Sequence, residues 1–138
     1  MEGWNGLIES TLDAVHVDPL NKEIRIELTC AWEDKTRKQI VAIGVDDFVL
    51  DEMRLSNVVD RVSCFNADDL HEIDSIAAKT LFFLLRGREP NPSDFEWPTL
   101  KEKLACIRDG TLSLLKIEPV YGAMVIVLAK DIKLQTMN

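Results

Sequence analysis

The stretch EIRIELTCAWEDKTRKQIVAIGV, residues 23–45, decides the expected fold. In its first part every second residue is apolar, namely Ile24, Ile26, Leu28, Cys30 and Trp32. A period of two predicts a strand with one buried and one solvated face, so we expect Trp32 in the core. The later run QIVAIGV, residues 39–45, is apolar at both parities. That pattern predicts a central strand covered on both faces.

Working outward from this stretch adds strands on both sides. Residues 12–18 alternate weakly and end in the turn-forming sequence DPLNK, so residues 12–45 are predicted to form a three-stranded antiparallel meander. Residues 46–57 fit either a strand or a short helical turn. VVDRVSCF, residues 58–65, alternates and predicts another strand.

Two helices and a hairpin are predicted in the remaining chain. The first helix begins near Asp68 and ends near Arg86, where Gly87 supplies a stop signal. The second helix has Pro98 in its first turn. Residues 111–134 carry two apolar runs around Tyr-Gly, which predicts a hairpin.

Strands, then helices, then strands are typical of an α+β fold. We therefore expect a largely antiparallel sheet with two helices packed on one face. The loop between the helices is too short to separate two domains, so residues 1–138 are predicted to form a single domain.

The charge and the cysteines narrow the classes of function. A formal net charge of −8 disfavours nucleic acid as a partner and favours a basic protein. The 3 cysteines are far apart and form no C-x-x-C, so neither a zinc site nor a redox pair is indicated. Free thiols and the lack of a signal peptide or a membrane-spanning stretch predict a cytoplasmic protein without a cofactor.

Four carboxylates follow the central strand: Asp46, Asp47, Asp51 and Glu52. They lack the glycine and the closing glutamate of a calcium loop, and two carboxylates converging across a cleft are not encoded by this spacing. We expect the chain to leave the sheet at residues 44–47 and the acids to point to water. As solvated groups they are candidate partner-binding residues.

Two aromatic residues are further candidates for partner binding. Phe95 and Trp97 lie in DFEWP, just before the second helix. Exposed aromatic side chains on an acidic surface suit a basic partner. The alternative, which the position before a helix favours, is that they close the loop onto the core.

No catalytic residue and no metal ligand is predicted. His16 is expected to be a partly buried side chain with a local hydrogen bond, and His71 is expected on a solvated helix face. Neither has a second histidine or cysteine at metal-ligand spacing. Cys64 is close in the sequence to an expected helix start, which would lower the pKa of its thiol, but the surrounding acids would raise that pKa, so it is not predicted to be catalytic. The scattered glycines form no nucleotide-binding motif.

The first half of the chain resembles small sheet-rich bacterial proteins of the immunity or uncharacterised type. The resemblance rests on an early hairpin, an apolar strand ending in Gly44-Val45, the following Phe48, and the step Asn57-Val58. It implies a protein that works by binding another protein, often a basic nuclease-like toxin, through an acidic surface. It assigns no functional residue.

Two classes of function are left. The first is a non-catalytic protein-binding module with a basic partner, immunity-like or an assembly component. The alternative is a small enzyme or ligand-binding domain with a pocket between sheet and helices, lined by His16, His71 or Cys64. Homo-oligomers formed through an exposed edge strand such as residues 124–129 are a further alternative.

Overall fold

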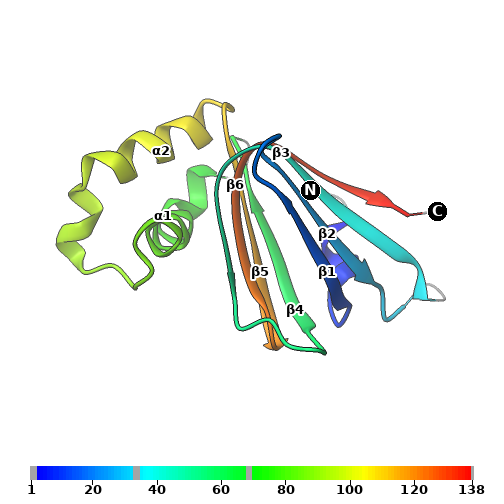
Figure 1. The fold of residues 1–138 in the computed structure, drawn as a ribbon. Coiled ribbons are helices and arrows are strands. Elements are labelled where there is room, and N and C mark those ends of the chain that lie inside the picture. The colour runs from blue at the N-terminus through cyan, green and yellow to red at the C-terminus, as the bar shows by residue number, and fades with distance from the viewer. Residues whose placement is uncertain (1–2, 33–34, 68–69, 138) are drawn as a thin grey trace.

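The protein is described by a computed structural model that covers residues 3–32, 35–67 and 70–137, with the side chains of residues 70–75 left out. This part of the chain contains six strands and two α-helices (Figure 1). They are β1 (Thr11–Asp18), β2 (Glu23–Thr29), β3 (Arg37–Asp51), β4 (Val58–Phe65), α1 (Leu70–Arg86), α2 (Pro98–Arg108), β5 (Ser113–Tyr121) and β6 (Met124–Thr136).

All pairings between neighbouring strands are antiparallel, and the sheet closes in the order β1-β2-β3-β6-β5-β4. The predicted meander and C-terminal hairpin are both confirmed. The closure was not predicted. It depends on a short seam in which Thr11 of β1 pairs with Val58 of β4, and the backbone N–H of Leu12 donates to the carbonyl of Asn57 at 2.8 Å.

Strand β3 corrects the expectation that the chain leaves the sheet at residues 44–47. The strand continues to Asp51 and pairs with β6 over nearly its whole length. A bulge between Val45 and Asp47 shifts the register, and a bulge bends a strand without ending it. Gly44 next to the bulge has φ +66, and a Cβ there would lie 2.8 Å from the side chain of Lys130.

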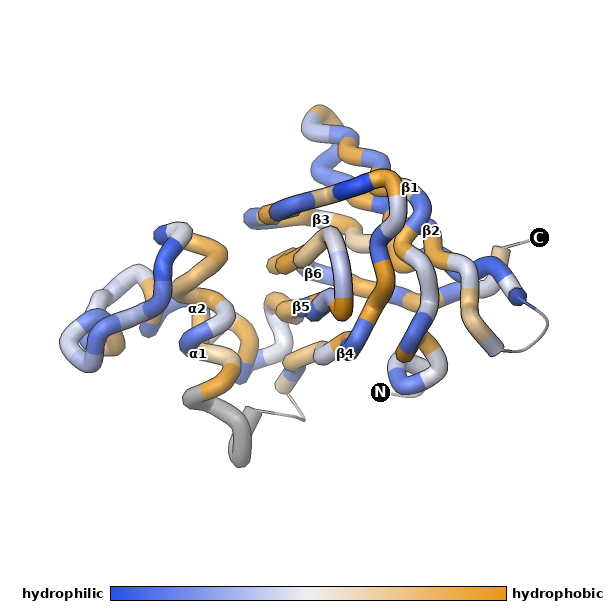
Figure 2. The backbone as a smooth tube through the Cα atoms, turned by 90° about the horizontal axis from the view of Figure 1, so that it is seen from below, coloured by the Kyte–Doolittle hydropathy of each residue, from blue (hydrophilic) through white to orange (hydrophobic). Residues whose placement is uncertain are grey.

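The buried residues form two clusters. One cluster fills the barrel with alternate residues of all strands, such as Ile26, Ile40 and Val127. The other joins both helices to outward residues of the strands, and it includes Leu81, Leu104, Leu114, Ile126 and Leu128. The two helices lie together on one side of the strands in both views of the chain (Figures 1 and 2).

The sequence patterns predict burial correctly in β2 but not at Trp32 or throughout β3. The alternating residues of β2 are buried as far as Cys30, but Trp32 is 62% exposed, which corrects its placement in the core. Strand β2 ends at Thr29, so the alternation no longer fixes a side by residue 32. In β3, Val41 is buried but Ile43 is 46% exposed, so that strand is not fully covered on both faces.

The helix boundaries agree with their sequence signals. Helix α1 ends at Arg86, and Gly87 follows with φ +73. Pro98 is the first residue of α2, where its missing N–H costs no helical hydrogen bond. Asp68, at which the first helix was expected to begin, lies outside the described residues.

Candidate functional site

The structure separates the four carboxylates into two pairs. Asp46 accepts a hydrogen bond from the ammonium group of Lys103 on α2 at 2.7 Å, and this bond raises the pKa of Lys103. Asp47 accepts the backbone N–H of Phe48 at 2.8 Å. Asp51 and Glu52 lie at the far end of β3, roughly 15 Å further along an extended strand.

Phe95 and Trp97 belong to the helical side of the molecule. Both are partly buried against the cluster that contains the helices. The ring of Trp97 packs edge-on against Phe82 with 5.9 Å between centroids, and the guanidinium of Arg86 lies 5.3 Å from its ring centre. These contacts support closure of the loop onto the helices, and the segment before α2 that carries both residues lies apart from the β3–β4 connection (Figure 1).

Exposed apolar side chains gather at the end of the barrel where Asp51 and Glu52 lie. We call this surface the loop end; it comprises Asp51, Glu52, Met53, Leu55, Val120 and Tyr121. Leu55 is fully exposed and Tyr121 is 54% exposed. The strand pairs Asp51–Met124 and Val58–Tyr121 bring the two connections together, and the Arg54 guanidinium lies 5.4 Å from the Tyr121 ring centre.

Asn57 holds the loop end in place. Its side chain is buried, and its Oδ1 accepts the backbone N–H groups of Arg54 at 2.9 Å and Ala123 at 3.0 Å. Its Nδ2 donates to the carbonyls of Arg54 at 2.8 Å and Leu12 at 3.3 Å. One amide therefore ties the β3–β4 connection to β1 and to the β5–β6 turn. Sequence reasoning missed this role, although a buried asparagine between turn residues is a usual anchor.

A groove lies between α1 and the sheet, where the alternative function, a small enzyme or ligand-binding domain, would need a pocket. Two adjoining hollows of about 260 and 380 Å³ share Ile76, Thr80 and Lys116 in their walls. Cys64 lines the second hollow. His16 lies elsewhere on β1, and the side chain of His71 is outside the described residues.

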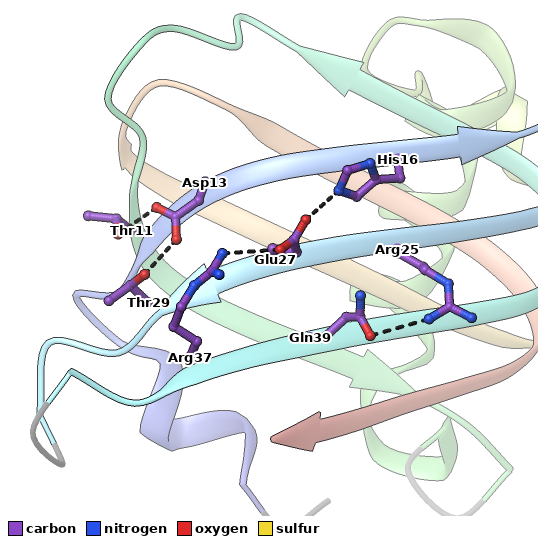
Figure 3. Close-up of polar contacts among 8 residues, drawn as sticks. All are labelled: Thr11, Asp13, His16, Arg25, Glu27, Thr29, Arg37 and Gln39. Atoms are coloured by element: carbon purple, nitrogen blue, oxygen red, sulfur yellow. Dashed lines mark hydrogen bonds and ion pairs between the residues drawn. The ribbon is translucent and has the colours of Figure 1, made fainter. Parts of the chain in front are cut away.

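His16 belongs to a polar network on the outer face of β1, β2 and β3 (Figure 3). Its Nε2 contacts a carboxylate oxygen of Glu27, and the other oxygen accepts from Arg37 at 3.1 Å. The hydrogen bond with His16 is the main reason why the pKa of Glu27 is lowered. The His16 side chain is 59% exposed, so it is not partly buried as expected, although its local hydrogen bond is present.

The neighbouring end of this face has a second polar contact. Asp13 accepts hydrogen bonds from the hydroxyls of Thr11 at 2.9 Å and Thr29 at 2.6 Å (Figure 3). These groups lie on exposed strand faces and are satisfied by one another. The arrangement is a cross-strand network that stabilises the pairing of β1 with β2.

Within residues 3–32, 35–67 and 70–137, no group of three or more His, Cys, Asp or Glu side chains is placed to hold a metal ion. No helix in the same part of the chain is long and apolar enough to cross a membrane. The chain matches no protein-family model, no curated protein and no solved structure.

Proposed function

We propose that the protein is a non-catalytic binding module that recognises a basic protein through the loop end. The observation that carries the proposal is the position of the exposed Leu55 and Tyr121 beside Asp51 and Glu52. Apolar and aromatic side chains supply most of the binding energy of an interface, and carboxylates at its rim select a basic partner. The net charge of −8 acts in the same direction, because it speeds the approach of cations.

The fixed conformation of the loop end also supports the proposal. Asn57 anchors the β3–β4 connection through four hydrogen bonds to backbone groups. A surface that is ordered before it binds loses less conformational entropy on binding. We therefore assign the binding role to Asp51 and Glu52, together with Leu55 and Tyr121.

The other candidate residues have structural contacts that favour a different role. Asp46 is paired with Lys103, and Trp97 packs on Phe82. We propose that they help to fix the two helices on one outer face of the barrel, a placement supported by the mixed helix and strand cluster. The immunity-type resemblance, the cytoplasmic location and self-association all stay hypotheses.

Affinity capture from a lysate of the source organism at low salt, with elution by rising salt, tests the proposal. We expect the unaltered protein to retain a basic protein, which mass spectrometry identifies. The two purified proteins should then bind each other again in solution. The double variant Asp51→Asn/Glu52→Gln should weaken rebinding and reduce its salt dependence. Leu55→Ser/Tyr121→Ala should weaken rebinding at every salt concentration, since it removes apolar contacts.

The matched control is Glu96→Gln/Glu102→Gln, which changes the net charge by the same amount on the helical side of the molecule. This control should rebind the partner as the unaltered protein does. Equal losses in both charge variants would show that binding follows overall charge, and they would contradict a specific site at the loop end.

A further inference from the structure

The groove beside α1 has a charged floor in a place where the fold otherwise puts apolar residues. On the outer face of the sheet, Ser63, Lys116 and Ile126 are directly paired across β4, β5 and β6. Ile126 and the neighbouring outward residue Leu114 are buried under the helices. Lys116 lies beside both, opposite Ile126 and two residues along β5 from Leu114, and its side chain is only 29% exposed.

The cations of the groove are poorly neutralised. Within the part of the chain that the structure describes, Lys116 has one ion-pair partner, Glu118 on the same strand, at the long distance of 3.5 Å. Arg61, opposite Glu118, and Lys79 of α1 also line the groove. Among the described residues neither Arg61 nor Lys79 is paired with a carboxylate. Counted over the described side chains alone, the walls thus hold three cations against two carboxylates, Glu118 and Glu89, in a protein whose net charge is −8.

The rest of the groove is apolar. Ile76 on α1 is 55% exposed, and Phe83, Met124 and Ile126 line the first hollow beyond it. Thr80 and Ser63 add hydroxyl groups near Lys116. Small-molecule sites in proteins combine such an apolar lining with a few polar groups that fix the orientation of the ligand.

We propose that this groove binds a small organic anion with an apolar body, a carboxylate at one end and an aliphatic chain behind it. The anionic group is held by Lys116 and Arg61, with hydrogen bonds from the hydroxyls of Ser63 and Thr80. The aliphatic part lies on Ile126 and Met124 below Ile76 and Phe83. A volume of about 260 Å³ for the hollow that Phe83, Met124 and Ile126 line limits the ligand to a short or medium chain.

This site does not depend on the protein-binding role of the loop end. The groove is built from α1 and the outer face of β4, β5 and β6, whereas the loop end is built from the β3–β4 and β5–β6 connections. Either proposal can therefore fail while the other holds.

Titration of the ¹⁵N-labelled protein with octanoate, followed by NMR, tests the inference, with 1-octanol as the uncharged probe of equal chain length. Octanoate should shift the amide signals around Lys116 and Ile126. We expect 1-octanol to bind about tenfold more weakly, since a charge-assisted contact is lost. Rising salt should weaken binding of octanoate and leave binding of 1-octanol unchanged.

Two variants with opposite expected effects locate the anionic group. Lys116→Met keeps the length of the side chain and removes its charge, and it should weaken octanoate binding about tenfold. Glu118→Gln removes the competing carboxylate and should strengthen it about threefold. The second variant alters a partly exposed residue and adds no bulk, so it reports on binding even if Lys116→Met fails to fold.

Strand β6 supplies a matched control. Lys133 faces outward and pairs with Asp131 two residues away at 3.3 Å, just as Lys116 pairs with Glu118, but it lies outside the groove. Lys133→Met should leave octanoate binding unchanged. The inference is overturned if octanoate shifts no groove amides, if 1-octanol binds equally well, or if Lys133→Met weakens binding as much as Lys116→Met.

Discussion

The barrel has two outer faces that differ in what covers them. The face formed by β1, β2 and the first half of β3 is open and carries ion pairs between charged side chains, such as Glu27 and Arg37. The face formed by β4, β5 and β6 carries Leu114, Ile126 and Leu128, which are buried in one cluster with residues of both helices. Both enclose the same interior. The polarity of a strand's outward residues therefore indicates whether another element packs on that face. Its inward residues are apolar in either case, because they belong to the common core.

The largest expected effect comes from one substitution made on each face. Ile126→Ala empties a fully buried site under the helices and should lower the free energy of unfolding by about 3 kcal/mol. Ile43→Ala on the open face should cost about 1 kcal/mol or less, since Ile43 is half exposed. Urea unfolding measures both. Equal losses would contradict the contrast between a covered and an open face.

The next effect concerns Asn57, whose backbone carbonyl and side chain hold the seam between β1 and β4. Gly122 has φ +90, and a Cβ there would lie 2.3 Å from Oδ1 of Asn57, so Gly122→Ala should cost about 3 kcal/mol. Gly87 has φ +73 with open space around it, and Gly87→Ala should cost about 1 kcal/mol. Thermal and urea unfolding compare the two. A smaller loss at Gly122 would mean that the Asn57 anchor is dispensable.

A smaller effect is expected where α2 is tied to β3. Asp46→Asn removes the ion pair with Lys103 and should cost about 0.5 kcal/mol near neutral pH. The pair raises the pKa of Lys103, so its contribution should be lost as the pH rises through that raised pKa. Asp47→Asn is the control, because an amide oxygen can still accept the N–H of Phe48. If urea unfolding shows equal losses for Asp46→Asn and Asp47→Asn, the ion pair with Lys103 does not stabilise the fold.

The smallest effect is expected in the network of the open face. The hydrogen bond with His16 lowers the pKa of Glu27, so Glu27 contributes stability above its ordinary pKa and loses it as the pH falls through the lowered value. Glu27→Gln should therefore be slightly destabilising near neutral pH, and this loss should shrink as the pH falls through the lowered pKa of Glu27. Glu102→Gln on α2 should show no such difference. A pH-independent loss would point to packing instead of charge.

Much of the fold could be predicted from the sequence because burial leaves a period-two pattern. EIRIELT alternates and forms a strand with one open face, and MVIVLA is apolar at both parities and is covered on both. Closure of the barrel could not be predicted, since it depends on one pairing between Thr11 and Val58. Trp32 was misplaced because the alternation continues in the sequence beyond the end of the strand.

The candidate sites were less predictable for a physical reason. Asp51 and Glu52 could be named from the sequence, but their apolar neighbours Val120 and Tyr121 come from the last hairpin. The position of Lys116 among buried residues depends on where α1 crosses the sheet. Such neighbours are set by tertiary pairing, which leaves no local pattern in the chain.

The long pairing of β3 with β6 has a consequence for how the chain acquires its structure. It joins residues 38–51 to residues 124–136, so partners about ninety positions apart must meet before the barrel closes. During translation the backbone groups at the edge of β3 would lack their partners until β6 has left the ribosome. Folding of the barrel should thus be slow and should finish only after β6 has been synthesised, and a chaperone that shields this edge would raise the yield of native protein.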